Sequence, residues 1–205
     1  MQPFKTHTGI VAPLQRENVD TDQIIPKQFL KRTERTGYGD FLFFDWRYDG
    51  NGRPNAQFSL NQPAYRRATI LLAGKNFGCG SSREHAVWAL RDYGFRAVIA
   101  SSFADIFSTN CVKNGIVPVA LSPVAVVEFM ARAFTGSFSL KIDLEQCTVA
   151  AQDGFVCSFQ MDPFQRACLL EGTDEIGATL KCLKQIEDYE KSRHTFLNRP
   201  VVDNF

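Results

Sequence analysis

Hydrophobic and polar positions follow a regular order in the middle of the chain, between residues 68 and 134. Short apolar runs are typical of buried strands, and apolar residues three or four apart are typical of amphipathic helices. The two patterns alternate as a strand at 68–74, a helix at 83–93, a strand at 95–100, a helix at 103–115, a strand at 116–121 and a helix at 123–134. This order predicts a parallel strand–helix–strand–helix–strand core with right-handed crossovers.

Glycine, serine and proline mark the ends of these elements. Gly94 and Gly115 follow the first two helices, and glycine commonly ends a helix because it adopts a left-handed conformation. Ser122 is a good N-cap for the third helix, and Pro123 suits its first position. Pro118 lacks a backbone donor, so we expect the third strand at a sheet edge or at a bulge.

Further strands flank this core. Residues 8–14 predict a strand before it, and 138–143, 146–152 and 155–161 predict three strands after it. Asp153–Gly154 is a strong hairpin signal between the last two strands.

Helices are predicted near the end of the chain, at 162–172 and at 174–193, where Thr173 is the expected cap. Residues 195–205 are expected as a loose C-terminal extension. Because no internal repeat or long linker separates these parts, we predict one α/β domain with three layers over residues 1–205.

In residues 17–67 the hydrophobic residues do not recur at a spacing typical of a helix or a strand. Within this stretch, residues 27–38 are basic and contain glycine, and we expect a mobile loop there. The aromatic run Phe41–Trp46 follows. Aromatic clusters usually pack in cores, so core packing is favoured over a role as an exposed contact surface.

Composition narrows the class of protein. The 205 residues are 44% hydrophobic, which suits a folded domain, and the net charge of +1 gives no basic footprint for nucleic acid or an anionic membrane. No apolar run approaches the roughly 20 residues of a membrane span. The N-terminal residues lack the apolar core of a signal peptide, so we expect a cytoplasmic protein.

Six cysteines, at positions 79, 111, 147, 157, 168 and 182, include no CxxC pair. A structural zinc site or a local iron–sulfur cluster is therefore not expected on this chain, and most of the cysteines are expected as small buried residues. Cys79 differs because it lies inside a glycine-rich turn.

That turn belongs to the stretch NFGCGSSREHAVWAL, residues 76–90, which joins a predicted strand to a predicted helix. Unpaired N–H groups and the helix dipole favour an anion at such a turn. The dinucleotide pattern GxGxxG fails, because Arg83 occupies the place of the third glycine, and the P-loop and GxSxG patterns are absent as well.

Two hydroxyls and a guanidinium remain at the start of the helix. Arg83 could hold a carboxylate with two parallel hydrogen bonds, and Ser81 or Ser82 could exchange a proton with a small carboxylate substrate. The competing interpretation is structural: Ser82 would be a helix cap, Glu84 would support the first turn, and Arg83 would be a solvated charge. His85 has no second ligand nearby and is expected to be structural.

Residues 76–90 closely resemble the signature of the small subunits of 3-isopropylmalate dehydratase, relatives of the C-terminal swivel domain of aconitase. Three further stretches resemble that family in the same order: NVDTDQIIPKQFLKRTERTGYGDFLF (18–43), SFADIFSTNCVKNGIVPV (102–119) and EGTDEIG (171–177). Together they cover most of the chain. The resemblance implies the three-layer β/β/α swivel fold of that family, in its bacterial form.

The resemblance also implies roles for particular residues. Ser81 would act as the base on the substrate carbon, Arg83 would grip a carboxylate, Ser82 would add a hydrogen bond, and Asp22 would be the active-site aspartate. The loop 27–38 would govern substrate choice. Its candidate residues are Lys27, Lys31, Arg32, Arg35 and Tyr38, none of which is assigned to a particular substrate group.

For cofactor and partner, the resemblance implies a [4Fe–4S] cluster on a separate large subunit and no metal on this chain. The heterodimer would isomerise 2-isopropylmalate and 3-isopropylmalate through isopropylmaleate, by dehydration and rehydration, in leucine biosynthesis. This chain alone would be inactive toward that small dicarboxylate. Two alternatives stay open: a related hydro-lyase acting on methylmalate and citraconate or on homoaconitate, and a stand-alone anion-binding domain.

Overall fold

The computed structural model describes residues 1–31, 34 and 36–192. The strands are β1 (Thr6–Leu14), β2 (Ala68–Ala73), β3 (Ala97–Ala100), β4 (Val117–Ala120), β5 (Ser139–Asp143), β6 (Thr148–Ala151) and β7 (Val156–Ser158). The α-helices are α1 (Thr21–Ile24), α2 (Phe44–Arg47), α3 (Glu84–Tyr93), α4 (Asp105–Lys113), α5 (Pro123–Phe134), α6 (Pro163–Glu171), α7 (Glu175–Leu180) and α8 (Leu183–Ser192). Short 3-10 helices lie at Lys27–Lys31, Gly39–Phe41, Ser59–Asn61 and Pro63–Tyr65.

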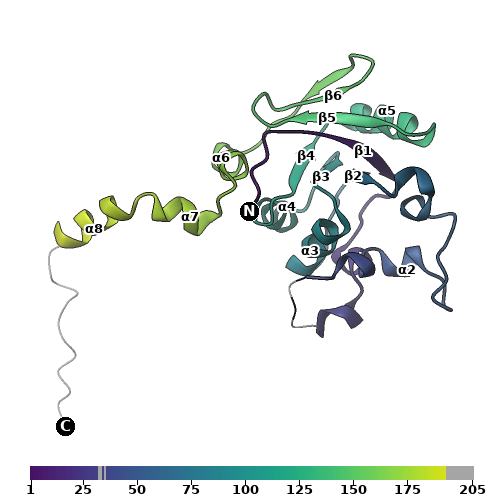
Figure 1. Ribbon diagram of the computed structural model, residues 1–205, viewed down its shortest axis with the longest axis horizontal. Helices are drawn as coiled ribbons and strands as arrows, with labels where there is room; N and C mark the ends of the chain where they lie inside the picture. The colour runs from purple at the N-terminus through teal and green to yellow at the C-terminus, as the bar shows by residue number, and fades with distance from the viewer. Residues whose placement is uncertain (32–33, 35, 193–205) are drawn as a thin grey trace, which may run out of the picture.

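β1 is the central strand of a seven-stranded sheet with the order β4-β3-β2-β1-β5-β6-β7 in the described residues (Figure 1). It pairs in parallel with β2 and antiparallel with β5, so it joins a parallel half to an antiparallel half. β4 lies at the parallel edge, where Pro118 needs no partner for a missing N–H, as predicted. The α/β class and the parallel core are confirmed.

Both faces of the parallel strands are buried, which explains their continuous apolar runs. In β2, Leu71 and Ala73 face the core shared with α3, and Ile70 and Leu72 face the core shared with α5. The antiparallel strands β5 and β6 contribute to that second core as well, and Figure 1 shows α5 beside them. The molecule therefore has helices on one face of the parallel strands, and α5 with the antiparallel strands on the other.

Several predicted helix ends are confirmed. Gly94 ends α3 with a φ of 117°, and Gly172 ends α6 with a φ of 71°. The Ser122 hydroxyl accepts a hydrogen bond from the Ala125 amide at 3.3 Å and so caps α5. These helix ends could be predicted from the sequence because each depends on one residue type at one position of a helix.

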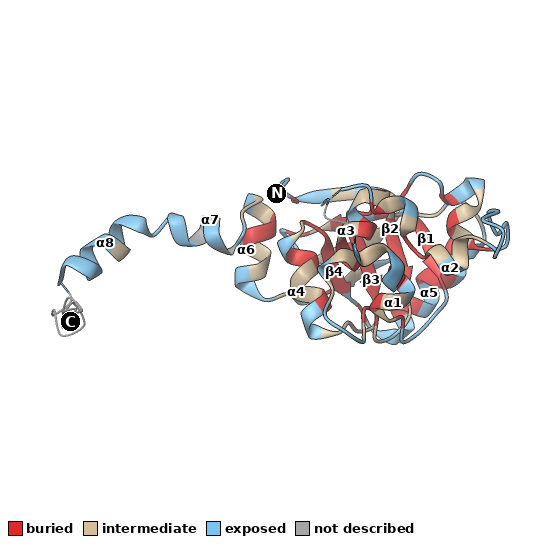
Figure 2. Cartoon of the chain, turned by 90° about the horizontal axis from the view of Figure 1, so that it is seen from below, coloured by how far each residue is buried: buried red, intermediate tan, exposed pale blue. Residues whose placement is uncertain are grey.

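The helix predicted at 174–193 is divided, because α7 ends at Leu180 and α8 begins at Leu183. The cap also differs from the prediction: the Asp174 carboxylate, not Thr173, accepts the hydrogen bond of the Gly177 amide at 2.7 Å. Figures 1 and 2 show α7 and α8 extending away from the body with mostly exposed residues. No described helix combines the length and apolar character needed to cross a membrane. The extension predicted at 195–205 lies outside the described residues.

The segment between β1 and β2 packs on the α3 side of the sheet. Leu42 and Phe43 are fully buried, and the Trp46 ring stacks on Phe43 with centroids 5.4 Å apart. Core packing of the aromatic run is therefore confirmed. Of the loop predicted at 27–38, residues 32, 33 and 35 lie outside the described residues, and its mobility stays a prediction.

Candidate active site

The predicted site lies where the parallel strands β1, β2 and β3 end. In open parallel sheets, ligands bind in the crevice beyond the carboxyl ends of the strands. The loops after these strands are joined through the turn at residues 76–80: the Phe77 amide donates to the Ser102 carbonyl at 3.0 Å, and the Gly78 amide donates to the Val19 carbonyl at 2.8 Å. Three segments that are distant in sequence thus form one edge.

The loops after β1 and β2 run side by side as a ladder of main-chain hydrogen bonds. The rungs join Gly74 N to Arg16 O (2.9 Å), Asn18 N to Lys75 O (2.8 Å), Gly78 N to Val19 O (2.8 Å) and Thr21 N to Cys79 O (3.0 Å). This ladder, between residues 16–21 and 74–79, aligns the start of α1 with the glycine-rich turn. The relative position of the two segments is therefore set by backbone atoms.

Gly78 is required by its surroundings as well as by its conformation. Its φ is +77°, and a Cβ there would lie 2.1 Å from the Phe107 ring. The neighbouring Gly80 has a φ of +85°, and a Cβ there would lie 3.3 Å from that of Asp20. The glycines thus let the turn approach α4 and the loop before α1.

We predict that Gly78→Ala lowers the free energy of unfolding by about 2 to 4 kcal/mol, because left-handed strain adds to a clash with a buried ring. Urea denaturation of the isolated chain measures the loss. Gly154→Ala is the matched control, since Gly154 also has a positive φ, of +90°, but a Cβ there would meet no atom within 4 Å. Equal losses in both variants would contradict the predicted clash.

The helix that follows the turn has no side-chain cap. α3 begins at Glu84, and Arg83 occupies the N-cap position without a capping hydrogen bond from its side chain. The structural interpretation of Ser82 as the cap is therefore wrong, and Ser81 and Ser82 are both exposed. Two hydroxyls at this helix start have no capping task.

An ion pair joins the turn to α1. The Arg83 Nη1 group contacts Asp22 Oδ1, and Lys27 Nζ lies 3.4 Å from Asp22 Oδ2. The Arg83 side chain is only 17% exposed, whereas Asp22 is 37% and Lys27 is 73% exposed. The fold brings Asp22 and Lys27 to the turn, although Asp22 and Arg83 are 61 positions apart in the sequence.

A cavity of about 230 Å³ opens at this point. One part of its wall is polar, formed by Thr21 and the turn at 80–83. Another part comes from the first turn of α4, where Ala104, Ile106 and Phe107 are apolar and Asp105 carries a carboxylate. The starts of α3 and α4 both face this space, so helix dipoles add positive potential to that of Arg83. Such a cavity suits a small anion with an apolar group.

The residues predicted in the loop 27–38 lie in different environments. Lys27 lies at the site through Asp22, and Lys31 is exposed at the end of the 3-10 helix. Tyr38 is fully buried, with its ring 5.5 Å from that of His85, so the structure places it in the core and not in the cavity. Arg32 and Arg35 lie outside the described residues.

Sequence reasoning assigned no role to Thr21, whose hydroxyl donates to the Ser81 carbonyl at 2.8 Å. The signal was its place beside Asp22 in the DTDQ stretch. The first turn of α4 belongs to a stretch that resembles the family, but no role was predicted for its residues. Its place beside the cavity follows from the packing of Phe107 against Gly78.

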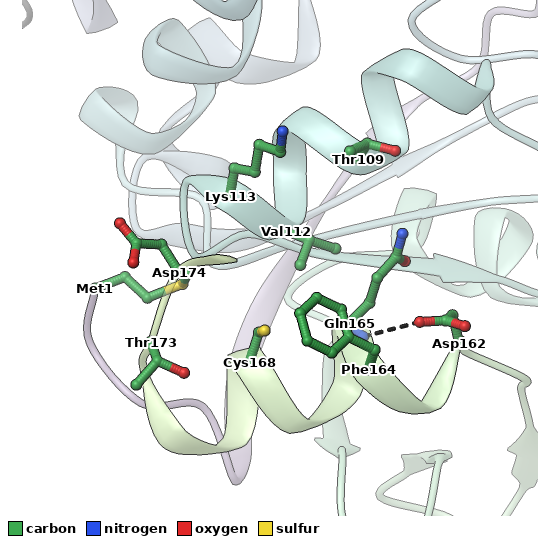
Figure 3. A pocket seen from close by; sticks show the side chains of 10 residues that line it. All are labelled: Met1, Thr109, Val112, Lys113, Asp162, Phe164, Gln165, Cys168, Thr173 and Asp174. Carbon is green, nitrogen blue, oxygen red and sulfur yellow. Dashed lines mark hydrogen bonds between the residues drawn. The ribbon is translucent and has the colours of Figure 1, made fainter. Parts of the chain in front are cut away.

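A second, smaller cavity of about 120 Å³ lies between α4 and α6 (Figure 3). Asp162 on its wall is engaged in capping α6, since it accepts from the Gln165 amide at 3.0 Å. None of the predicted catalytic residues reaches this space. It is a gap between helices and not the candidate active site.

The cysteines fit the expected structural role in part. Burial raises the pKa of the Cys111 thiol, which keeps it protonated and inert. Cys111 and Cys168 are buried, Cys79, Cys147 and Cys157 are half-buried, and Cys182 is exposed. In the described part of the chain, no three His, Cys, Asp or Glu side chains gather to hold a metal ion.

We predict that Cys79→Ser keeps most of the activity of the assembled enzyme. Cys79 serves the ladder through its main chain, since its amide donates to Val19 and its carbonyl accepts from Thr21. Serine has a similar size and the same backbone groups. Steady-state kinetics check this, and a loss as large as that of Ser81→Ala would show that the thiol itself takes part.

The chain is similar to known proteins over most of its length. A model of the aconitase C-terminal domain family matches residues 1–124. The 3-isopropylmalate dehydratase small subunit of Halalkalibacterium halodurans is 58% identical over 193 residues, which cover 94% of this chain and 100% of that protein. The corresponding protein of Bacillus subtilis is 53% identical over 197 residues, which cover 96% and 99%.

A solved structure is also similar to this chain. The crystal structure of 3-isopropylmalate dehydratase from Methanocaldococcus jannaschii matches with a TM-score of 0.63 and 26% identity, covering 90% of this chain and 99% of that one. These matches confirm the family resemblance of the sequence. The chain belongs to the family of 3-isopropylmalate dehydratase small subunits, within the aconitase C-terminal domain family.

Proposed function

We propose that the chain is the small subunit of a hydro-lyase that interconverts 2-isopropylmalate and 3-isopropylmalate through isopropylmaleate, in cytoplasmic leucine biosynthesis. One observation carries the proposal: in a chain of this family, Ser81 and Arg83 line a single cavity, and Asp22 pairs with Arg83. The relatives named above carry the name of that enzyme's small subunit.

Each group has a task in this reaction. The guanidinium of Arg83 binds a substrate carboxylate, because among the described residues its one hydrogen bond runs from Nη1 to Asp22, and a guanidinium has further N–H groups for an anion. Asp22 holds that guanidinium in place, and Lys27 lies beside the other carboxylate oxygen of Asp22. The apolar side chains of Ala104, Ile106 and Phe107 offer a surface for the apolar part of the substrate.

Ser81 then moves the proton. In dehydration the deprotonated Oγ takes the proton from the substrate C–H while hydroxide leaves the adjacent carbon, which gives the alkene, neutral Ser81 and one hydroxide. In rehydration neutral Ser81 returns the proton to one carbon and hydroxide adds to the other, which restores the deprotonated Ser81. The positive potential of Arg83 and of the start of α3 favours the deprotonated form of Ser81 that this step needs.

The site is incomplete without a partner. We propose that a large subunit covers the cavity and carries the [4Fe–4S] cluster, which as a Lewis acid would assist departure of the hydroxyl. A heterodimer then accounts for a chain that offers serine, arginine and aspartate but, in its described residues, no cluster of metal-ligating side chains.

Reconstitution tests the proposal. The small chain, the iron-loaded large subunit and their mixture are each given 2-isopropylmalate, and the isopropylmaleate double bond is followed by its ultraviolet absorbance. Turnover is expected only in the mixture. Turnover by this chain alone without iron would overturn the division of labour, and a higher kcat/KM with citraconate or homoaconitate would assign the complex to a related hydro-lyase.

A further inference from the structure

Thr21 stands out among the residues around the cavity because its polar side chain is buried. It is 2% exposed and sits at the first position of α1. A buried hydroxyl without a partner destabilises a protein, so the partner of a buried threonine shows what its hydroxyl is fixed to. Here the Oγ1 atom donates to the main-chain carbonyl of Ser81 at 2.8 Å.

Ser81 depends on this contact. Within the described residues, the bond from Thr21 is the one hydrogen bond in which Ser81 takes part. Ser81 is exposed and follows Gly80, which has a φ of +85° and no side chain to restrain it. A serine at such a place would sample many positions unless its backbone were held.

The hydrogen bond from Thr21 to Ser81 also continues the contacts between the two loops. The main-chain ladder ends at Thr21 N and Cys79 O, 3.0 Å apart, and the ion pair of Asp22 with Arg83 lies beyond it. The hydrogen bond of the Thr21 hydroxyl to Ser81 lies between the last rung of the ladder and the ion pair. It ties the backbone of Ser81 to the helix that carries Asp22.

We propose that Thr21 is a positioning residue: its hydroxyl holds the main chain of Ser81 so that the Ser81 Oγ lies at the proton-transfer position while Arg83 pairs with Asp22. This rests on the proposed function of Ser81. Thr21 touches no substrate in this role and acts through Ser81. Misplacing a reacting group by about 1 Å can cost about 100-fold in rate, so one anchoring bond is worth a measurable part of kcat.

A matched pair of substitutions isolates the hydroxyl. Thr21→Val keeps the shape and removes the donor, and Thr21→Ser keeps the donor and removes a methyl group. In the complex with the large subunit, Thr21→Val is expected to lower kcat about 10- to 100-fold with a much smaller change in KM, and Thr21→Ser to restore most of it. Thr135→Val is the control, because the Thr135 hydroxyl also donates to a main-chain carbonyl at 2.8 Å, at the far end of α5.

A double-mutant cycle separates positioning from general stability. If Thr21 acts through Ser81, adding Thr21→Val to Ser81→Ala causes little further loss of kcat, whereas a purely structural role gives losses that multiply. A melting temperature for each variant identifies loss of folding. Wild-type kcat in Thr21→Val, or multiplied losses in the double variant, would overturn the proposal.

Hydrogen exchange in the isolated full chain gives a readout that needs no activity. Thr21→Val is expected to speed exchange of the amides of residues 80–83, and Thr21→Ser is expected to leave it near the wild-type rate. Unchanged exchange in Thr21→Val would overturn the anchoring of Ser81. An inactive wild-type complex with this exchange pattern intact would instead overturn the proposed reaction alone, so the two failures are distinguishable.

Discussion

Replacing Ser81 by alanine is expected to lower kcat of the assembled enzyme by about 10² to 10⁴-fold, with little change in KM. A general base acts in the transition state, so its loss affects the chemical step more than substrate binding. The side chain is exposed at the cavity and caps no helix, so the substitution removes an oxygen without disturbing a structural bond. Initial rates over a range of isopropylmalate concentrations separate kcat from KM.

The neighbouring serine provides the comparison for this result. Ser82 lies on the same turn and lines the same cavity, and it is proposed to bind rather than to exchange a proton. Ser82→Ala should therefore raise KM more than it lowers kcat. Near-normal kinetics for Ser81→Ala, or a larger fall in kcat for Ser82→Ala, would remove Ser81 from the role of base.

Changing Arg83 to lysine is expected to raise KM about 10- to 100-fold. Lysine keeps the positive charge but loses the fork that can hold Asp22 and a substrate carboxylate at once. A hydrogen bond to a charged group contributes about 1.5 to 3 kcal/mol, which corresponds to roughly 10- to 150-fold in affinity. The low exposure of Arg83, 17%, limits screening by solvent.

Arg91→Lys is the matched control for this substitution. Arg91 lies in the last turn of the same helix, α3, and its side chain is 40% exposed. Its variant should leave KM and kcat near the wild-type values, and circular dichroism should show both variants folded. An unchanged KM in Arg83→Lys would return Arg83 to a structural role as the partner of Asp22.

The regular part of the fold could be predicted because its signals are local. Strands β2, β3 and β4 coincide with apolar runs, and the ends of α3, α5 and α6 coincide with glycine or serine at fixed helix positions. Pro118 indicated a sheet edge or a bulge, and β4 lies at an edge. One helix was predicted where two exist, because the apolar spacing of residues 176–186 continues through the break between α7 and α8.

The chemistry of the glycine-rich turn indicated Ser81, Ser82 and Arg83 as candidates, but Asp22 could be added to the site only through family resemblance. No period or spacing relates Asp22 to Arg83, since their contact depends on parallel pairing of β1 with β2 and on the ladder beyond those strands. The burial of Tyr38 could not be predicted for the same reason: a residue in an aperiodic basic loop shows no sign of packing against His85 until α3 is in place. The roles of the site residues stay predictions until the variants are measured.

The backbone ladder between residues 16–21 and 74–79 has a consequence for how this sequence can change over evolution. Its rungs are amides and carbonyls, which every residue except proline supplies, so the exposed side chains along it can be exchanged without moving Asp22 relative to Arg83, whereas Gly78 and Thr21 are restricted by their contacts. A single inserted or deleted residue in either loop would shift every later rung by one position and separate that pair. Selection is therefore expected to hold fixed the length of both loops, together with these two residues.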